Sequence, residues 1–234
     1  VALPEVDGRI ITRAVSFKRA RRDEATQCDL ATHAPVSDRV DFVAELAVNW
    51  VKLRRRAPAE RRVALVLANY PIRDGRIGNG VGLDTPAATV QVLRALQAAG
   101  YAVRDIPENG NALIELMQAG ATNDWRALAH REKRETLLLP DYLAWFHSQP
   151  RALRDKVMAR WGRPEDDPFF AKGALTCGDF ILPATRFGTV TVAVQPARGY
   201  NIDPSASYHD PDLVPPHNYL AFHAWLQDGF RADA

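Results

Sequence analysis

The chain has 234 residues, enough for one large domain or two small ones. Its 47% hydrophobic and 25% charged residues are typical of an ordinary globular protein. The net charge of +2 gives no global argument for binding nucleic acid or a membrane. No apolar run approaches the roughly 20 residues that cross a bilayer, and no signal peptide is present. We therefore expect neither nucleic acid nor a membrane as a partner.

The only two cysteines, Cys28 and Cys177, lie far apart and form no CxxC pair. This spacing argues against a disulfide framework and against a structural zinc site, and it fits the reducing cytoplasm. The sequence also begins without an initiator methionine. We expect a cytoplasmic protein of which residues 1–234 are an excised piece.

Residues 10–17 alternate loosely between apolar and polar and predict an extended segment. The next segment predicts an amphipathic helix, because its apolar residues recur at intervals of three and four from Val40 to Val51. Ser37 is the expected N-cap. Two basic clusters, residues 18–22 and 52–56, are interpreted as solvated faces, and the second suits the negative end of the helix.

Residues 62–69 form a continuous apolar run closed by Tyr70 and Pro71, which predicts a buried parallel strand. Thr85 and Pro86 then predict the N-cap and first residue of a helix through residue 99. Gly100 is the expected stop. Because residues 101–106 predict a second strand, the whole region predicts a βαβ unit.

Residues 111–162 predict a helical excursion, with helices over 112–118, 141–147 and 151–161. Residues 180–182 and 190–194 predict strands, and a closing helix is expected from Pro216 to Leu226. The expected architecture is a single α/β domain over residues 1–234, with a mostly parallel sheet, flanking helices and this helical insertion.

The glycine-rich loop of residues 75–84 lies between a predicted strand and a predicted helix. Its Gly78, Gly80 and Gly82 do not have the G-x-G-x-x-G spacing of dinucleotide sites, and no P-loop lysine follows. Asp84 at the helix entry would repel a phosphate. A nucleotide is therefore disfavoured here, although a Rossmann-like nucleotide-dependent oxidoreductase or transferase remains the alternative. Another ligand could contact the loop at Asn79 and Gly80.

A long polar loop joins the strand at residues 190–194 to the closing helix. Loops of this length in a compact domain are usually functional or disordered, and buriable side chains at Tyr200, Ile202 and Leu213 argue against disorder. Open α/β sheets place ligand sites at the carboxyl ends of their strands. The alternative is a rigid surface loop. The site candidates in and beside the loop are Gln195, Arg198, Tyr200, Asn201, Asp203, His209, Asp210 and His217.

Metal binding in this loop is only weakly indicated. Imidazole and carboxylate groups suit cobalt, zinc or iron, and the loop offers them at His209, Asp210, Asp212 and His217. Their spacing matches no standard structural site. We therefore expect at most a transient metal contact, at His209 and Asp210. Arg198 beside Tyr200 offers a planar cation and an aromatic face, which suit a carboxylate and a flat ring.

Three segments carry a resemblance to a known family: residues 65–71, residues 74–86 and the loop of residues 195–217. Together they resemble the large tetrapyrrole-binding subunit of aerobic cobaltochelatase, the CobN family, which is related to the porphyrin-binding H subunit of magnesium chelatase. The resemblance runs from Leu3 to the last residue. It implies a piece of the subunit that binds hydrogenobyrinic acid a,c-diamide and receives Co²⁺ in cobalamin biosynthesis. It also implies that AAA+ partner subunits hydrolyse ATP, which is not bound here.

The resemblance also implies roles for the loop residues. His209, Asp203 and His217 are expected to act in catalysis, because metal insertion must release two pyrrole protons. The substrate is expected to contact Arg198, Tyr200, Asn201, Gln195, Asn79 and Gly80. Magnesium-chelatase relatives carry a carboxylate where Asn201 stands, which favours Asn201 and Asp203 as site positions. Since the family continues beyond Ala234 into a His-Gly-rich motif, the piece alone should be inactive. A non-catalytic docking module for the motor subunits is the second alternative.

Overall fold

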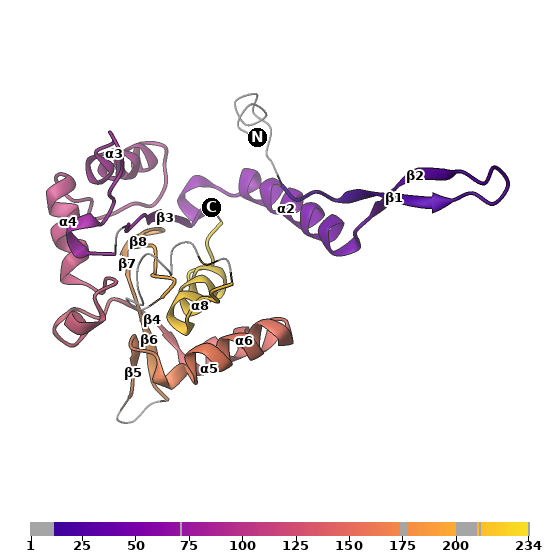
Figure 1. Cartoon of the computed structure of the whole chain (residues 1–234). Helices are drawn as coiled ribbons and strands as arrows, with labels where there is room; N and C mark the ends of the chain where they lie inside the picture. Colours follow the sequence, from indigo (N-terminus) through magenta and orange to yellow (C-terminus); the bar gives the residue numbers. More distant parts are fainter. Residues whose placement is uncertain (1–11, 71, 174–176, 200–209, 211, 234) are drawn as a thin grey trace. The chain divides into compact units, whose positions relative to one another are not determined.

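The computed structural model describes residues 12–70, 72–173, 177–199, 210 and 212–233 (Figure 1). The chain divides into two compact units, residues 1–56 and 57–234. The sequence predicts one α/β domain over the same residues. The helix of the first unit is the reason for the division, because none of its residues is buried and none belongs to a hydrophobic core of the described residues.

The first unit consists of a hairpin and a helix. Strand β1 (Ser16–Arg22) pairs antiparallel with β2 (Asp29–Pro35), and helix α2 (Ser37–Arg55) follows. The sequence predicts α2 correctly but only an extended segment where the hairpin lies. Its predicted cap is wrong, because Val36 is the N-cap and no side chain there accepts a hydrogen bond. Several large apolar residues of α2 remain exposed, among them Trp50 at 49% and Val48 at 51%.

A three-stranded sheet in the order β3–β8–β7 forms the centre of the second unit (Figure 1). Strand β3 (Val63–Leu67) runs parallel to β8 (Val190–Val194), as predicted, and β7 (Ala184–Phe187) is antiparallel to β8. The other strand pairs of the described residues are also antiparallel. The fold is therefore α/β with small mixed sheets, and a mostly parallel sheet is not confirmed.

The strand predicted at residues 101–106 does not form. The Val103 N–H donates to the Tyr101 carbonyl at 2.8 Å, which closes a three-residue turn. The chain then takes a left-handed conformation at Asp105. In the part of the chain that the structure describes, one backbone hydrogen bond joins this segment to the residues between β7 and β8, from the Thr189 N–H to the Ala102 carbonyl at 3.0 Å. The βαβ unit predicted from this segment is therefore wrong, because local turn bonds replace the strand ladder.

Strand β8 separates two cores by the alternation of its side chains. Val190, Val192 and Val194 pack with helices α3 (Thr85–Ala98) and α4 (Gly110–Ala119). Ala193 packs instead with residues of helix α8 (His217–Ala224). Figure 1 shows α3 and α4 on one side of this sheet and α8 on the other. Both faces of β8 are covered, which explains why its residues are apolar except for Thr191, whose hydroxyl donates to the Thr185 carbonyl at 3.2 Å.

A second sheet in the order β4–β6–β5 is antiparallel and lies beside helices α5 and α6 (Figure 1). Its strands β4, β5 and β6 are Glu135–Leu138, Phe170–Ala171 and Asp179–Leu182. Helices α5 (Leu139–Ser148) and α6 (Arg151–Trp161) confirm two predicted helices. The expected excursion over 111–162 is not wholly helical, because it contains β4. Short turns complete the unit at Pro58–Glu60, Asp74–Arg76, Trp125–His130, Pro164–Asp166 and Trp225–Gly229, the last being π-helical.

Among the described residues, no helix is long and apolar enough to cross a membrane.

Candidate functional site

A cavity of about 250 Å³ lies where the parallel strands β3 and β8 end. The pairing continues one step past both strands, because the Gln195 N–H donates to the Leu67 carbonyl at 2.9 Å. Carboxyl ends of adjacent parallel strands are where open α/β sheets bind ligands. The residues that line this first cavity are Ala68, Asn69, Tyr70, Ile72, Gln195, Pro196, Ala197, Arg198 and Tyr219.

The first cavity combines an apolar wall with a few polar groups. Tyr70 and Tyr219 contribute aromatic rings, and Tyr70 is 55% exposed. The structure brings the predicted Gln195 and Arg198 together in the lining. The Arg198 Nη2 donates to the Leu213 carbonyl at 2.9 Å, so its guanidinium also ties the two ends of the loop. A lining of this kind suits a flat apolar ligand with polar edges.

Asn123 fixes the chain at the mouth of the first cavity. Its Nδ2 donates to the Gln195 carbonyl at 2.9 Å, and its Oδ1 accepts the Ala197 N–H at 3.0 Å. The Asn123 side chain is 6% exposed. These two bonds satisfy the backbone that leaves β8, which otherwise loses its ladder partners beyond Gln195. The amide therefore positions the residues of the lining that follow β8.

The glycine-rich loop is bound to β3 and to itself. Gly78 has a left-handed φ of 68°, and its N–H donates to the Ala68 carbonyl at 2.7 Å. The Asn79 Nδ2 donates to the Tyr70 carbonyl at 3.3 Å. Asn79 and Gly80 are exposed, and neither lines the first cavity. Their predicted substrate contacts stay a prediction.

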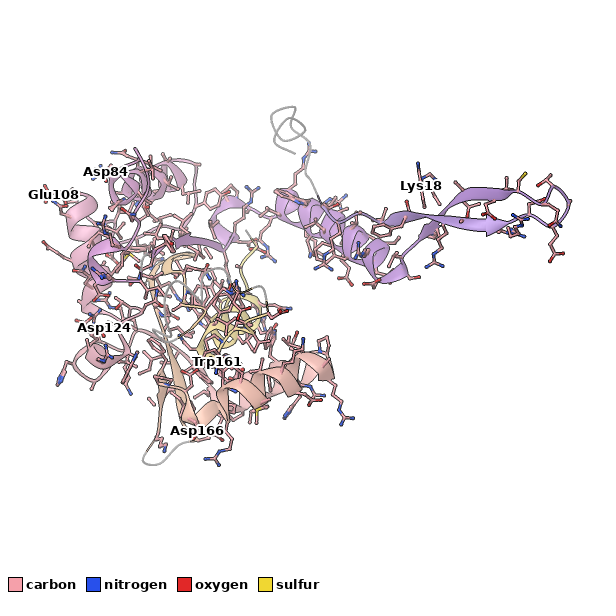
Figure 2. All side chains as sticks on the ribbon, viewed as in Figure 1. Lys18, Asp84, Glu108, Asp124, Trp161 and Asp166 are labelled. Atoms are coloured by element: carbon pink, nitrogen blue, oxygen red, sulfur yellow. The ribbon has the colours of Figure 1, made fainter. Side chains whose placement is uncertain are left out.

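Asp84, rather than the predicted Thr85, is the N-cap of α3. Its Oδ1 accepts the Ala87 N–H at 3.1 Å. Figure 2 shows Asp84 at this helix, away from the sheet. The prediction was one residue late because both residue types cap helices well. A carboxylate already occupies the helix end, which is where a phosphate would bind.

Asp74 anchors the same loop to the chain after α4. Its carboxylate forms an ion pair with Arg131, and its Oδ1 accepts the Thr122 hydroxyl at 2.7 Å. Arg131 also donates to Thr122 Oγ1 at 2.8 Å. The two charged side chains are only 13% and 25% exposed, for Arg131 and Asp74 respectively. This partly buried triad holds the loop beside the residues that carry Asn123.

A second cavity of about 400 Å³ adjoins the first, and Ile72 lines both. Its other residues are polar: Arg73, Asp74, Asn123, Asp124 and Arg126. Figure 2 shows Asp124 at the outer edge of the second unit. The Asp124 Oδ1 accepts the Arg126 N–H at 3.2 Å and so begins the turn that presents Arg126.

His217 has no exposed surface, and both of its ring nitrogens have partners. Nε2 lies 3.0 Å from the Gly162 carbonyl, which can only accept, so Nε2 carries the hydrogen. Nδ1 therefore accepts the Tyr142 hydroxyl at 2.6 Å. Burial lowers the pKa of His217, against the opposing effects of the Gly162 bond and of Glu165 and Asp166. Burial also raises the pKa of Tyr142.

The free energy of unfolding should fall as the pH decreases, because two buried or partly buried histidines resist protonation in the folded chain. Burial lowers the pKa of His223 as well as that of His217. Below the ordinary value of about 6.5, the unfolded chain binds protons that the folded chain does not. The loss should approach about 1.4 kcal/mol per pH unit for the fully buried His217 until its lowered folded pKa is reached, and it should be smaller for the partly buried His223. Urea unfolding between pH 7 and 5 measures it.

The matched variants are His217→Gln and His147→Gln. His147 lies exposed on α5. The first change should make the pH dependence shallower than that of the parent, and the second should leave it unchanged. An unaltered slope in the His217 variant would contradict the assignment.

Several predicted site residues lie outside the described residues: Tyr200, Asn201, Asp203 and His209. Asp210 is described and exposed, and its Oδ1 accepts the Asp212 N–H at 2.8 Å. Within the described ranges, no group of three or more His, Cys, Asp or Glu side chains is arranged to hold a metal. The transient metal contact at His209 and Asp210 stays a prediction.

Sequence reasoning missed three residues of the site: Tyr70, Asn123 and Tyr219. Tyr70 closes a predicted strand and lies in a segment that carries the family resemblance, but neither signal assigns it a role in the site. Asn123 belongs to a polar turn after α4, and nothing in its neighbourhood indicates a partner 72 residues away at Gln195. The position of Tyr219, two residues after His217 in the closing helix, was the only available signal for it.

Comparison with known proteins decides the family. A family model described as CobN/Magnesium Chelatase matches residues 1–234. The chain belongs to this family. It is 58% identical over its whole length to the aerobic cobaltochelatase subunit CobN of a Sinorhizobium species, of which it spans 18%. It is 28% identical to the H subunit of the magnesium chelatase of Rhodobacter capsulatus, again over its whole length and 19% of that protein.

A solved structure supports the same family at the level of the fold. The catalytic subunit of cobaltochelatase from Mycobacterium tuberculosis superposes with a TM-score of 0.78 at 40% identity. The match covers all of this chain and 19% of that protein. The chain therefore spans less than a fifth of the length of each of these relatives. The predicted resemblance to the CobN family is confirmed.

Proposed function

We propose that this chain is part of the tetrapyrrole-binding subunit of an ATP-dependent cobaltochelatase in cobalamin biosynthesis. The substrate is hydrogenobyrinic acid a,c-diamide, and Co²⁺ is the metal inserted into it. ATP is hydrolysed by AAA+ partner subunits and not by this chain. The observation that carries the proposal is the CobN family match over residues 1–234. The reaction forms nitrogen–metal bonds, and the site is completed by the rest of the same subunit.

The first cavity supports a flat ring as the ligand. Tyr70 and Tyr219 supply aromatic surface, on which a conjugated macrocycle packs well. Arg198 and Gln195 supply hydrogen bonds at its edge. A volume of about 250 Å³ is less than the roughly 300–1,000 Å³ of typical small-molecule sites. The ligand must therefore extend past this cavity, for example past Ile72, which also lines the adjoining second cavity.

Proton removal is assigned to the loop. Insertion of a divalent metal releases two pyrrole protons, so the site needs a general base near the ring. We assign this role to His209 and Asp203, and a transient contact with Co²⁺ to His209 and Asp210. Tyr200 and Asn201 are assigned to substrate binding. For His217 a supporting role replaces the expected catalytic one, because its ring is buried and both nitrogens are engaged.

Titration of the corrinoid into the intact protein tests the cavity assignment. Tyr219→Ala should weaken binding by about tenfold, because one aromatic contact is lost. Arg198→Ala should weaken it by roughly 10- to 100-fold through a lost charge-assisted hydrogen bond. Circular dichroism of each variant reports whether it remains folded. The change in corrinoid absorbance on binding gives the dissociation constant.

The control lies in another cavity of about 550 Å³, lined by residues of α5 and of the turn after α8. Gln227 in that lining is exposed, and Gln227→Ala should bind like the parent. Weaker binding by the Gln227 variant, with parental binding by the Tyr219 and Arg198 variants, would move the site to the other cavity.

A further inference from the structure

The two adjoining cavities differ in chemistry. The first presents Tyr70, Pro196, Ala197 and Tyr219, whereas the second presents arginine, aspartate and asparagine side chains. Ile72 lines both. Asn123 lines the second and binds the backbone of two residues that line the first, Gln195 and Ala197. A ligand with an apolar body and a charged edge would satisfy both at once.

Among the charged side chains of the second cavity, the Arg126 guanidinium is the one placed to receive an anion. The Asp74 carboxylate is matched by Arg131 and by the Thr122 hydroxyl. The Asp124 carboxylate accepts the backbone N–H of Arg126. In the described part of the chain, no ion pair includes the Arg126 guanidinium, which stacks 5.1 Å from the centre of the Trp125 ring.

Arginine is well suited to a carboxylate in such a place. Its planar fork donates two parallel hydrogen bonds to the two carboxylate oxygens. The stacking on Trp125 reduces the freedom that Arg126 would lose on binding, and Asp124 fixes the turn that carries it. The cavity also holds about 400 Å³, which is more than one carboxylate and its short side chain require.

We propose that the second cavity is an anion subsite that binds a peripheral carboxylate of the tetrapyrrole, with Arg126 as its cation. The inference rests on the proposed function, since it places the ring in the first cavity. The subsite would make the protein prefer a ring whose side chains end in free carboxylates. A ring that carries amides in place of these carboxylates cannot form the ionic, two-pronged contact with Arg126.

Two probes separate the subsite from the ring cavity in the intact protein. One is coproporphyrin, whose side chains end in carboxylates, and the other is coproporphyrin with these groups converted to primary amides. Titration follows porphyrin fluorescence at low and at high salt. Arg126→Gln should weaken binding of the acid by about tenfold, and Arg126→Glu by more. Both variants should bind the amide like the parent. At high salt, the loss of affinity for the acid caused by these variants should be smaller, because the contact between Arg126 and the carboxylate is exposed to solvent.

The matched control is Arg160→Glu. Arg160 is exposed on α6 and stacks 5.0 Å from the centre of the neighbouring Trp161 ring, as Arg126 does on Trp125. This variant should bind both probes like the parent. If Arg126→Glu and Arg160→Glu weaken binding of the acid equally, the effect comes from the overall charge of the protein, and the proposed subsite is wrong. The subsite is also wrong if Arg126→Glu weakens binding of the acid and of the amide to the same degree.

Tyr219→Ala distinguishes failure of the subsite from failure of the function. It should weaken binding of both probes, because it removes part of the ring cavity. If it does so while Arg126→Glu binds the acid like the parent, the subsite is wrong and the ring cavity stands. If neither variant changes the binding of either probe, the ring cavity and the subsite are both wrong.

Discussion

Replacing His217 with alanine should lower the free energy of unfolding by roughly 3–5 kcal/mol. The change empties a fully buried ring position between Tyr142 and Phe146, which the remaining side chains cannot fill. It also leaves the Tyr142 hydroxyl and the Gly162 carbonyl without their partner, and each unsatisfied buried group costs about 1–3 kcal/mol. Urea unfolding monitored by tryptophan fluorescence measures the loss.

Two variants control this result. His147→Ala removes an exposed histidine from α5 and should unfold like the parent. Tyr142→Phe removes only the hydroxyl that donates to His217. The double variant with His217→Ala should therefore lose less free energy of unfolding than the sum of the two single variants. Parental stability of His217→Ala would refute the supporting role and restore His217 as a candidate for catalysis, since catalytic groups are often replaced without loss of stability.

Replacing Asp74 with alanine should destabilise the chain by roughly 2–4 kcal/mol. Breaking a buried ion pair costs about 3–5 kcal/mol, and the 13% and 25% exposure of these two side chains reduces that figure. Arg131 would keep its charge and its bond to Thr122, but not its counterion. Hydrogen exchange of the amides at residues 72–84 should also become faster, because the loop loses its anchor.

An exposed ion pair on α6 is the control. Asp155 pairs with Arg151 at 3.5 Å, and their side chains are 69% and 87% exposed. Asp155→Ala should have no measurable effect on unfolding. The cycle of Asp74→Ala, Arg131→Ala and the double variant gives the coupling of the buried pair. Additive losses would show that the two side chains stabilise the chain independently, contrary to the geometry.

Elements with a strong local pattern were predictable from the sequence. Helices α2, α5 and α6 have apolar spacing or clear end signals, and β3 and β8 are apolar apart from Thr191. Residues 101–106 are also mainly apolar but include Arg104 and Asp105, and they form turns in which the Val103 N–H binds locally. The β1–β2 hairpin was missed because its side chains are exposed, so no burial pattern marks it.

Only the part of the candidate site that follows β8 was predictable from the sequence. Gln195 and Arg198 follow directly from a recognisable strand, and they do line the first cavity. The opposite side depends on contacts between distant segments. Asn123 reaches Gln195 across 72 residues, and Arg131 reaches Asp74 across 57. No local periodicity encodes such a pair, so spacing alone could not have found them.

The parallel pairing of β3 and β8 has a consequence for how the protein folds. The two strands meet only after the chain between them, which includes α3, α4 and α5, has been brought together. Closing such a long loop is slow, because its entropy must be lost before the strand contacts form. We therefore expect the first cavity to be among the last features to form during folding. Partly folded chains would expose its aromatic side chains without completing its lining, so a ligand of this cavity would bind only molecules in which this step is complete.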